Sequence, residues 1–214
     1  MDEDLAIVAE NTRKEQVKKF LIKQRKKIFL GLGLILIVIF SIFFYLDNIK
    51  KERINIANKF IQASLNYDEK KEDFYLKEFN EIIDTHDSTY SILALFFVVD
   101  NKISESNEKI NSLFDKVINE VKLEEEIKNL VIYKKALFNA DIKSENEMLE
   151  MLKPLTNSKS FWKPHALLLL GDYFLSKREK QKAKDFYSQI LKLEINNNNI
   201  YNQTLIRIQK NYGE

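Results

Sequence analysis

The sequence predicts an all-α protein in which a single transmembrane helix near the N-terminus is followed by a stack of short helices. Three observations favour this fold class. Residues 28–46 contain no charged side chain, residues 47–214 place their apolar side chains at helical spacing, and this second region contains only two prolines. Strand-like alternation of apolar and polar residues is absent from the sequence, so its pattern is helical throughout.

The apolar segment reads IFLGLGLILIVIFSIFFYL, and fifteen of its nineteen residues are Leu, Ile, Val or Phe. A helix of this length spans about 28 Å, close to the hydrocarbon thickness of about 30 Å. At about −0.3 to −0.6 kcal/mol per apolar residue, insertion into a bilayer is favoured by roughly 4 to 9 kcal/mol. Because a backbone in lipid must satisfy its own hydrogen bonds, we expect a helix here. Gly31 and Gly33 lie inside it and face either lipid or a neighbouring helix.

This segment is predicted to be an uncleaved anchor. The leader before it is 27 residues long and the segment ends in FFYL, whereas a cleavable signal has a shorter apolar stretch and a small-residue cleavage site. Eight Lys and Arg residues precede the segment within residues 13–27, against four within residues 50–59. The bias predicts a single-pass protein with a cytoplasmic basic tail at 1–27, an anchor at 28–46 and a domain at 47–214 on the other side of the membrane.

Composition and motifs argue against catalysis. The formal net charge is only +2, and the excess belongs to the tail, where anionic lipid headgroups attract it, so we expect no nucleic-acid partner. The chain has no cysteine, which excludes disulfides and thiolate zinc sites. It also lacks a Gly-x-Ser-x-Gly, phosphate-loop or His-Glu-x-x-His motif. We therefore expect no enzyme activity, cofactor, metal or small-molecule substrate.

The region after the anchor is predicted to alternate helices with short loops. Polar breaks and the capping box at Ser144 and Glu147 delimit the helices. The expected helices cover residues 48–66, 70–84, 88–100, 104–121, 123–140, 145–153, 161–176, 180–193 and 199–211. Such regular alternation indicates a repeat protein.

The last complete helix pair carries the clearest repeat pattern. A tetratricopeptide repeat has a bulky residue, then Leu-Gly, then an aromatic residue, and then Ala and a second aromatic residue in its next helix. The residues at these spacings are Leu167, Leu170, Gly171, Phe174, Ala183 and Tyr187. The glycine allows close helix approach, and the aromatic rings fill the space beside the small residues. The domain is therefore predicted to be a degenerate tetratricopeptide-like α-solenoid whose final helix is a cap.

The chain resembles the family of ancillary subunits of the SecYEG translocon. The resemblance rests on the architecture, on the opening MDEDLAIVAENTR, on YSILAL at Tyr90–Leu95, and on SFWKPHALLLLGDYFLSKREKQKAKDFYSQILK. These segments resemble the alphaproteobacterial branch of that family. The resemblance implies a noncatalytic, single-pass protein of the bacterial inner membrane whose domain at 47–214 is periplasmic. It also implies that this protein binds translocon subunits and periplasmic chaperones or clients. The alternative is a membrane-anchored repeat scaffold for another cell-envelope assembly.

The candidate partner-binding residues are His165, Leu168, Asp172 and Leu175. In the predicted register they share the concave face of the solenoid, and the two leucines suit an extended or helical peptide. A second interpretation remains open at this stage. The C-terminal helix around Tyr201, Leu205 and Ile208 could cover this face as the cap.

Two further groups have alternative interpretations. The stretch from Asp84 to Asp87 contains potential metal ligands, but it is better read as a polar turn in which Asp87 caps the next helix. Phe161 and Trp162 precede Pro164, and we expect them to pack the start of a helix, with a partner-facing aromatic anchor as the alternative.

Overall fold

A computed structural model describes residues 2–193 and 198–213, and this part of the chain is helical without any β-strand. The chain divides into two compact units, Met1–Asn55 and Ile56–Glu214. Helix α1 (Asp2–Leu65) begins in the first unit and ends in the second. The all-α prediction is therefore confirmed for the described residues.

The first unit consists of α1 up to residue 55. By length and composition, the described residues contain one helix that could cross a membrane, over Gly33–Leu65 near the N-terminus. None of its apolar window is buried, and Phe43 and Phe44 are 71% and 75% exposed. An apolar helix without a covering partner is what a membrane-spanning segment requires.

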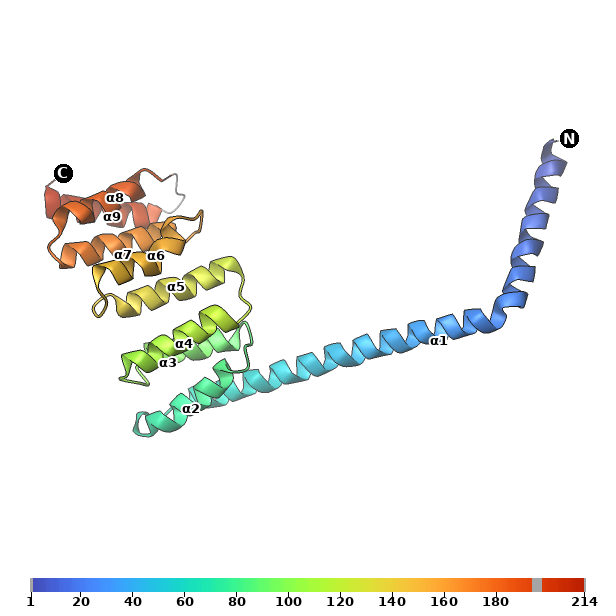
Figure 1. The fold of residues 1–214 in the computed structure, drawn as a ribbon, viewed down its shortest axis with the longest axis horizontal. Coiled ribbons are helices and arrows are strands. Elements are labelled where there is room, and N and C mark those ends of the chain that lie inside the picture. Colours follow the sequence, from blue (N-terminus) through green and yellow to red (C-terminus); the bar gives the residue numbers. More distant parts are fainter. Residues whose placement is uncertain (1, 194–197, 214) are drawn as a thin grey trace. The chain divides into compact units, whose positions relative to one another are not determined.

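The second unit contains the remaining helices, which follow one another in the order predicted (Figure 1). They are η1 (Glu69–Lys71), α2 (Glu72–Ile83), α3 (Tyr90–Asp100), α4 (Asn107–Glu120), α5 (Glu125–Asn139), α6 (Glu145–Thr156), α7 (Lys163–Ser176), α8 (Lys180–Leu191) and α9 (Asn198–Tyr212). The predicted capping box opens α6, with the Ser144 N–H donating to Glu147 Oε2 at 3.0 Å.

Two predicted boundaries are wrong by three residues. The helix expected at 104–121 begins only at Asn107. The helix expected at 145–153 continues through Pro154 to Thr156. In the last turn, Pro154 removes a single intrahelical hydrogen bond, and burial of Leu155 in the core offsets that loss.

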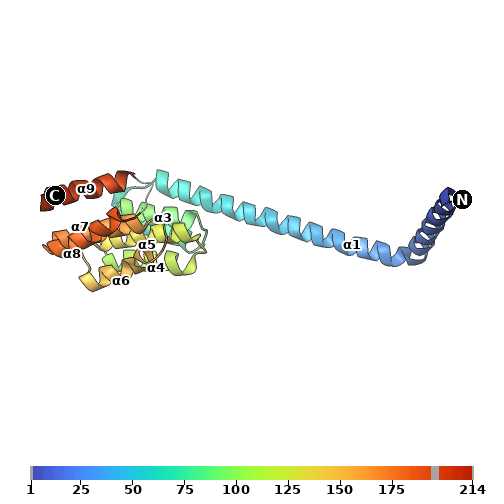
Figure 2. The same ribbon diagram turned by 90° about the horizontal axis from the view of Figure 1, so that it is seen from above.

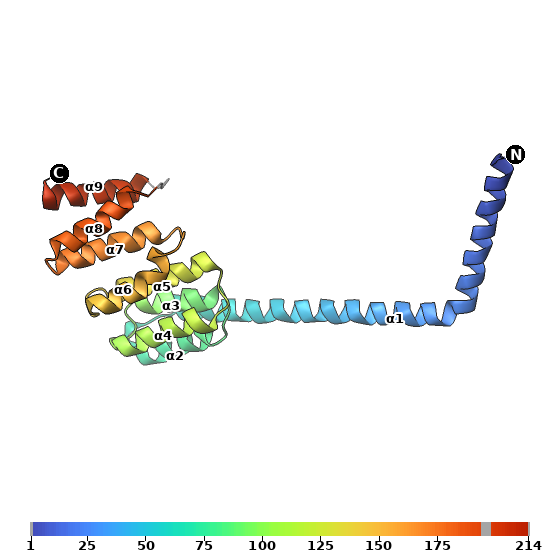
Figure 3. The same ribbon diagram turned by 45° about the horizontal axis from the view of Figure 1, so that its top comes forward.

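Helices that are adjacent in the sequence are adjacent in space. Each helix from α2 to α9 packs against the next, and α2 also contacts α4, α5 contacts α7, and α7 contacts α9. Figures 1 and 3 show the resulting stack, with α2 at one end and α9 at the other. Figure 2 shows α9 along one side of the stack, beyond α7.

Two apolar clusters form the core of this stack. The first joins residues 56–63 of α1 to α2, α3 and α4, and the rings of Phe60, Phe79 and Phe97 meet within it. The second joins α5 to α9 and centres on α7. Helix α5 contributes to both clusters, Val131 to the first and Ala136 to the second. Helix α5 therefore links the two clusters.

Helices α7 and α8 approach each other closely at Gly171. A Cβ atom added at Gly171 would lie 2.6 Å from Cδ1 of Tyr187, closer than real Cβ contacts. All six residues of the proposed repeat pattern are buried, including Tyr187 and Ala183 at 0% exposure. The prediction that Gly171 permits close packing against Tyr187 is confirmed.

Candidate partner-binding surface

The four candidate residues on α7 are not equally accessible. His165, Asp172 and Leu175 are half-buried, whereas Leu168 is only 7% exposed. Leu168 belongs to the same apolar cluster as Ile200 and Ile208 of α9. The expectation that Leu168 lies exposed in an open groove is therefore wrong, because the second core cluster encloses it.

Asp172 is bound to the C-terminal helix. Its carboxylate accepts hydrogen bonds from Arg207 Nε at 2.6 Å and Nη2 at 2.8 Å, and Tyr187 Oη donates to it at 2.7 Å. The hydrogen bonds to Asp172 raise the pKa of Arg207. Burial, followed by the hydrogen bond to Asp172, raises the pKa of Tyr187. The two-pronged ion pair joins α7 to α9, and the hydrogen bond from Tyr187 adds α8.

Helix α9 covers this side of α7 with a face that overlaps the predicted one. Its buried residues are Ile200, Thr204 and Ile208, at 6%, 0% and 8% exposure. Of the predicted stripe, Ile208 is buried, whereas Tyr201 and Leu205 remain 38% and 41% exposed. The interpretation in which the C-terminal helix packs on this face agrees with the geometry, with Ile200 and Thr204 buried in place of Tyr201 and Leu205.

His165 lies in an aromatic cluster rather than an open groove. Its ring centroid is 5.0 Å from that of Trp162, 5.7 Å from Phe161 and 6.0 Å from Tyr133. Burial lowers its pKa, and its buried Nδ1 atom has no hydrogen-bond partner among the described residues. Neutral imidazole is therefore the favoured form at neutral pH.

The loop before α7 is fixed to α5 by a polar network. Ser160 Oγ donates to Glu126 Oε2 at 2.8 Å and accepts from Asn129 Nδ2 at 3.1 Å, and the Phe161 N–H donates to Glu126 Oε1 at 3.3 Å. Trp162 stacks on Tyr133 at 5.5 Å between ring centroids, as expected for a residue that packs the helix start. Phe161 differs, because its side chain is 63% exposed.

An apolar groove lies between α3 and α5, where the sequence did not suggest a site. Its volume is about 650 Å³. The apolar residues that line it are Ile92, Leu93, Phe96, Leu123, Ile127 and Leu130, and polar side chains at its rim include Thr89, Lys122 and Glu124. Leu93 and Ile127 are 41% and 39% exposed. We refer to this feature as the α3–α5 groove.

One apolar segment of the sequence contributes to this groove, but its composition suggests a helix that is buried in the core. Residues 92–99 are almost entirely apolar, which suggests a helix buried on all sides. In the structure Ala94, Leu95 and Val98 face the core, whereas Leu93 and Phe96 line the groove. A fully apolar helix at the surface of a stack therefore leaves apolar side chains such as Leu93 exposed among the described residues.

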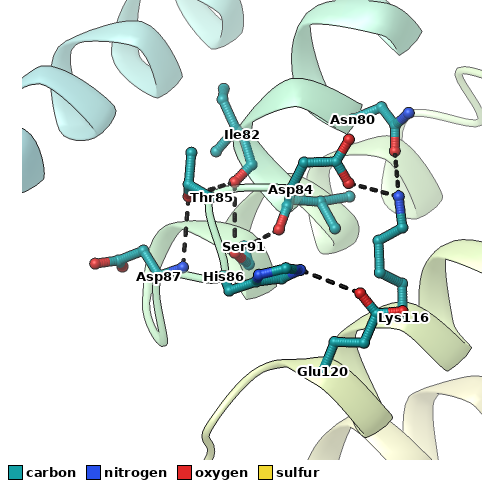
Figure 4. Close-up of polar contacts among 10 residues, drawn as sticks. Asn80, Ile82, Asp84, Thr85, His86, Asp87, Ser91, Lys116 and Glu120 are labelled. Carbon is teal, nitrogen blue, oxygen red and sulfur yellow. Dashed lines mark hydrogen bonds and ion pairs between the residues drawn. The ribbon is translucent and has the colours of Figure 1, made fainter.

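The turn from Asp84 to Asp87 is a capping structure. Asp87 Oδ1 accepts hydrogen bonds from the N–H groups of Thr89 and Tyr90 at 2.8 and 2.9 Å, as predicted. Figure 4 shows the turn beside α4, where Lys116 pairs with Asp84 and His86 Nε2 lies 3.1 Å from Glu120 Oε2. These contacts connect the turn to α4. Among the described residues, no three His, Cys, Asp or Glu side chains are grouped so that they could hold a metal ion.

Comparisons of the chain with protein-family models, with curated proteins and with solved structures give no match.

Proposed function

We propose that this protein is a noncatalytic, membrane-anchored interaction protein whose tetratricopeptide-like solenoid binds protein partners in the α3–α5 groove. The observation that carries this proposal is the groove itself, in which Leu93 and Ile127 are exposed beside the half-buried ring of Phe96. A contiguous apolar surface with a polar rim is typical of a protein-binding site.

The anchor supports the membrane part of the proposal. Helix α1 is long and apolar enough to cross a bilayer over Gly33–Leu65. Eight cations before the apolar segment and four after it favour a cytoplasmic N-terminus and a periplasmic repeat domain. In a bacterium this arrangement corresponds to a single-pass inner-membrane protein.

The packing of α7 on α8 supports a tetratricopeptide-like solenoid. Gly171 contacts the ring of Tyr187, as the repeat pattern requires, and α5 contacts both α6 and α7. In this architecture α3, α5 and α7 are the first helices of successive repeats and line the concave face. The α3–α5 groove then occupies the face that such proteins use for binding.

The resemblance described above supports the Sec translocon as the membrane partner, with periplasmic chaperones or clients at the groove. An apolar groove suits a segment of a client whose own apolar residues are not yet buried. The alternative function is a scaffold for another cell-envelope assembly, which would use the same anchor and groove.

The test is co-purification of the full chain from detergent-solubilised membranes. We expect the parent protein to recover translocon subunits together with a chaperone or client. Changing Leu93→Glu and Ile127→Glu together should remove the chaperone or client, because an apolar partner would bury unpaired charges. The translocon subunits should remain, because the anchor helix can contact them independently of the groove.

A control is Phe74→Glu, which places a charge on an apolar residue of α2 that lies outside the groove and is more exposed than Leu93 or Ile127. Phe74 is 57% exposed. We expect this variant to retain all partners. Retention of every partner by the folded groove variant would contradict the groove assignment. Recovery of division or outer-membrane assembly proteins in place of translocon subunits would favour the scaffold function.

A further inference from the structure

A histidine ring packs among aromatic side chains where the start of α7 meets α5. The ring centroid of His165 lies 5.0 Å from that of Trp162, 5.7 Å from Phe161 and 6.0 Å from Tyr133. Phe161 and Trp162 precede α7, whereas Tyr133 belongs to α5. We refer to these four residues as the aromatic cluster. Through this cluster, the segment before α7 and the first turn of α7 are held against α5.

Several features of the aromatic cluster disfavour a positive charge on His165. The Nδ1 atom is buried and forms no hydrogen bond with the described residues, so a proton placed there would be left without a partner in the present geometry. The partial positive charge of a helix N-terminus and the side chain of Lys163 in the same turn add like charge. Burial lowers the pKa of His165, and the Phe161 backbone, which favours the charged form, offsets only part of this effect.

The ionisable side chains on the neighbouring helices have other partners. Glu126 of α5 accepts hydrogen bonds from the segment before α7, and Asp172 of α7 is paired with Arg207 of α9. Burial, followed by the charge of Asp172, raises the pKa of Tyr133, so that this phenol stays neutral. Within the described part of the chain, neither carboxylate forms an ion pair with His165, and an imidazolium ring would lack a counterion.

We propose that the aromatic cluster is a pH-sensitive switch, in which protonation of His165 releases the segment of Phe161 and Trp162 from α5. An imidazolium ring regains its hydration by leaving the cluster, because the cluster consists of aromatic rings without a carboxylate. The core side chains of α7, such as Leu167 and Phe174, are buried among other residues, so the opening is confined to the segment and the first turn of α7. This inference does not depend on the α3–α5 groove, on the direction of insertion or on any partner.

The sign of the effect follows from the pKa of His165, which is lower in the folded chain than in an unfolded one. The folded state therefore binds this proton more weakly. The stability that the neutral ring contributes is present above the unfolded pKa of about 6.5, and it is lost as the pH falls from that value to the folded pKa. Acidification thus opens the switch, and neutral pH closes it.

Trp162 is the only tryptophan of the chain, so its fluorescence reports on the aromatic cluster directly. The emission maximum of an indole ring moves to longer wavelength when the ring passes from a buried site into water. We expect this shift in the full chain in detergent as the pH is lowered, with a midpoint below about 6.5. Quenching of Trp162 by acrylamide should increase with the same midpoint. The helical circular dichroism should stay constant, because the opening is local.

Two variants without a titratable group at this position should abolish the transition. His165→Phe retains a ring in the cluster, and His165→Gln covers the case in which the phenylalanine variant does not fold. The control is His86→Asn, which removes the only other histidine at an exposed ion pair with Glu120. Asparagine tolerates the positive φ of 54° at this position, and the variant should keep the transition.

Three results would overturn the proposal. The first is a parent emission maximum that stays constant down to about pH 5, below the range in which histidine ordinarily titrates. The second is a midpoint above about 6.5, which would show that cation–π attraction to the rings outweighs burial. The third is a loss of helical circular dichroism with the same midpoint, which would show unfolding of the domain in place of a local switch.

Discussion

Gly171 is the residue at which packing and intrinsic helix propensity oppose each other. Alanine favours a helix over glycine by about 1 kcal/mol, so propensity alone would make Gly171→Ala stabilising. The new methyl group would instead lie within 3 Å of the Tyr187 ring. That ring is fully buried, and its hydroxyl is held by Asp172, so it cannot move aside without breaking other contacts.

We expect Gly171→Ala to destabilise the domain by about 1–3 kcal/mol, because overpacking outweighs propensity. Thermal unfolding of the full chain in detergent, followed by circular dichroism, measures this change. Ser176→Ala on the exposed end of the same helix is the control and should have little effect. An unfolding temperature at or above that of the parent would show that the α7–α8 contact can relax and that the repeat register is not as described.

At the residue scale, the sequence predicted the roles of those residues whose contacts depend on a short local pattern. The Ser144 capping box, the Asp87 cap and the contact of Gly171 with Tyr187 each follow from a spacing of a few residues or from one repeat. The ion pair of Asp172 with Arg207 joins residues 35 positions apart, and no local pattern identifies it. Leu168 was misplaced for the same reason, since its burial depends on the second core cluster that α9 completes.

At the scale of elements, α9 is attached to the stack by an apolar stripe, by the ion pair of Arg207 with Asp172 and by a hydrogen bond from Tyr212 Oη to the Lys180 carbonyl oxygen. The side chains of Arg207 and Asp172 are 30% and 38% exposed, so water screens their interaction only in part. The geometry is two-pronged, which distinguishes it from the exposed pairs that contribute little to stability. The pair should therefore contribute measurably to the docking of α9.

A double-mutant cycle with Asp172→Asn and Arg207→Met measures this contribution. Asparagine retains an acceptor for Tyr187, and methionine retains the packing of the arginine side chain. We expect a coupling free energy of about 1–2 kcal/mol from unfolding of the full chain. The control cycle is the exposed pair of Lys153 and Glu150, at 58% and 72% exposure, which should give less than about 1 kcal/mol. Equal coupling in the two cycles would contradict a special role for Asp172.

The existence of each helix was easier to predict from the sequence than the face that it leaves exposed. Every helix of the second unit has a counterpart in the sequence-based list, because short polar loops and 3.6-residue periodicity are local signals. The exposed faces of α3 and α9 were not identified. Leu93 and Leu205 look like core residues in a sequence, and their exposure depends on which helices flank them in the completed stack.

At the scale of the whole molecule, α1 contains a segment that is long and apolar enough to cross a membrane, and such a crossing would separate the regions on its two sides. Its flanking charges favour a cytoplasmic N-terminus, with eight cations before the apolar segment and four after it. The α3–α5 groove belongs to the second unit and would then operate outside the cytoplasm. The direction of insertion is therefore a condition for the proposed function.

We expect protease added outside spheroplasts to digest the repeat domain and to spare the tail at residues 1–27. Changing Lys23, Arg25, Lys26 and Lys27 to glutamine would leave four cations before the segment, equal to the four after it. Because charge bias sets orientation, this variant should insert in both directions, and part of its repeat domain should become protected. Changing Lys70, Lys71, Lys77 and Lys109 removes the same number of charges far from the segment and should leave the orientation unchanged. Protection of the parent domain until the inner membrane is broken would reverse the proposed topology and place the α3–α5 groove in the cytoplasm.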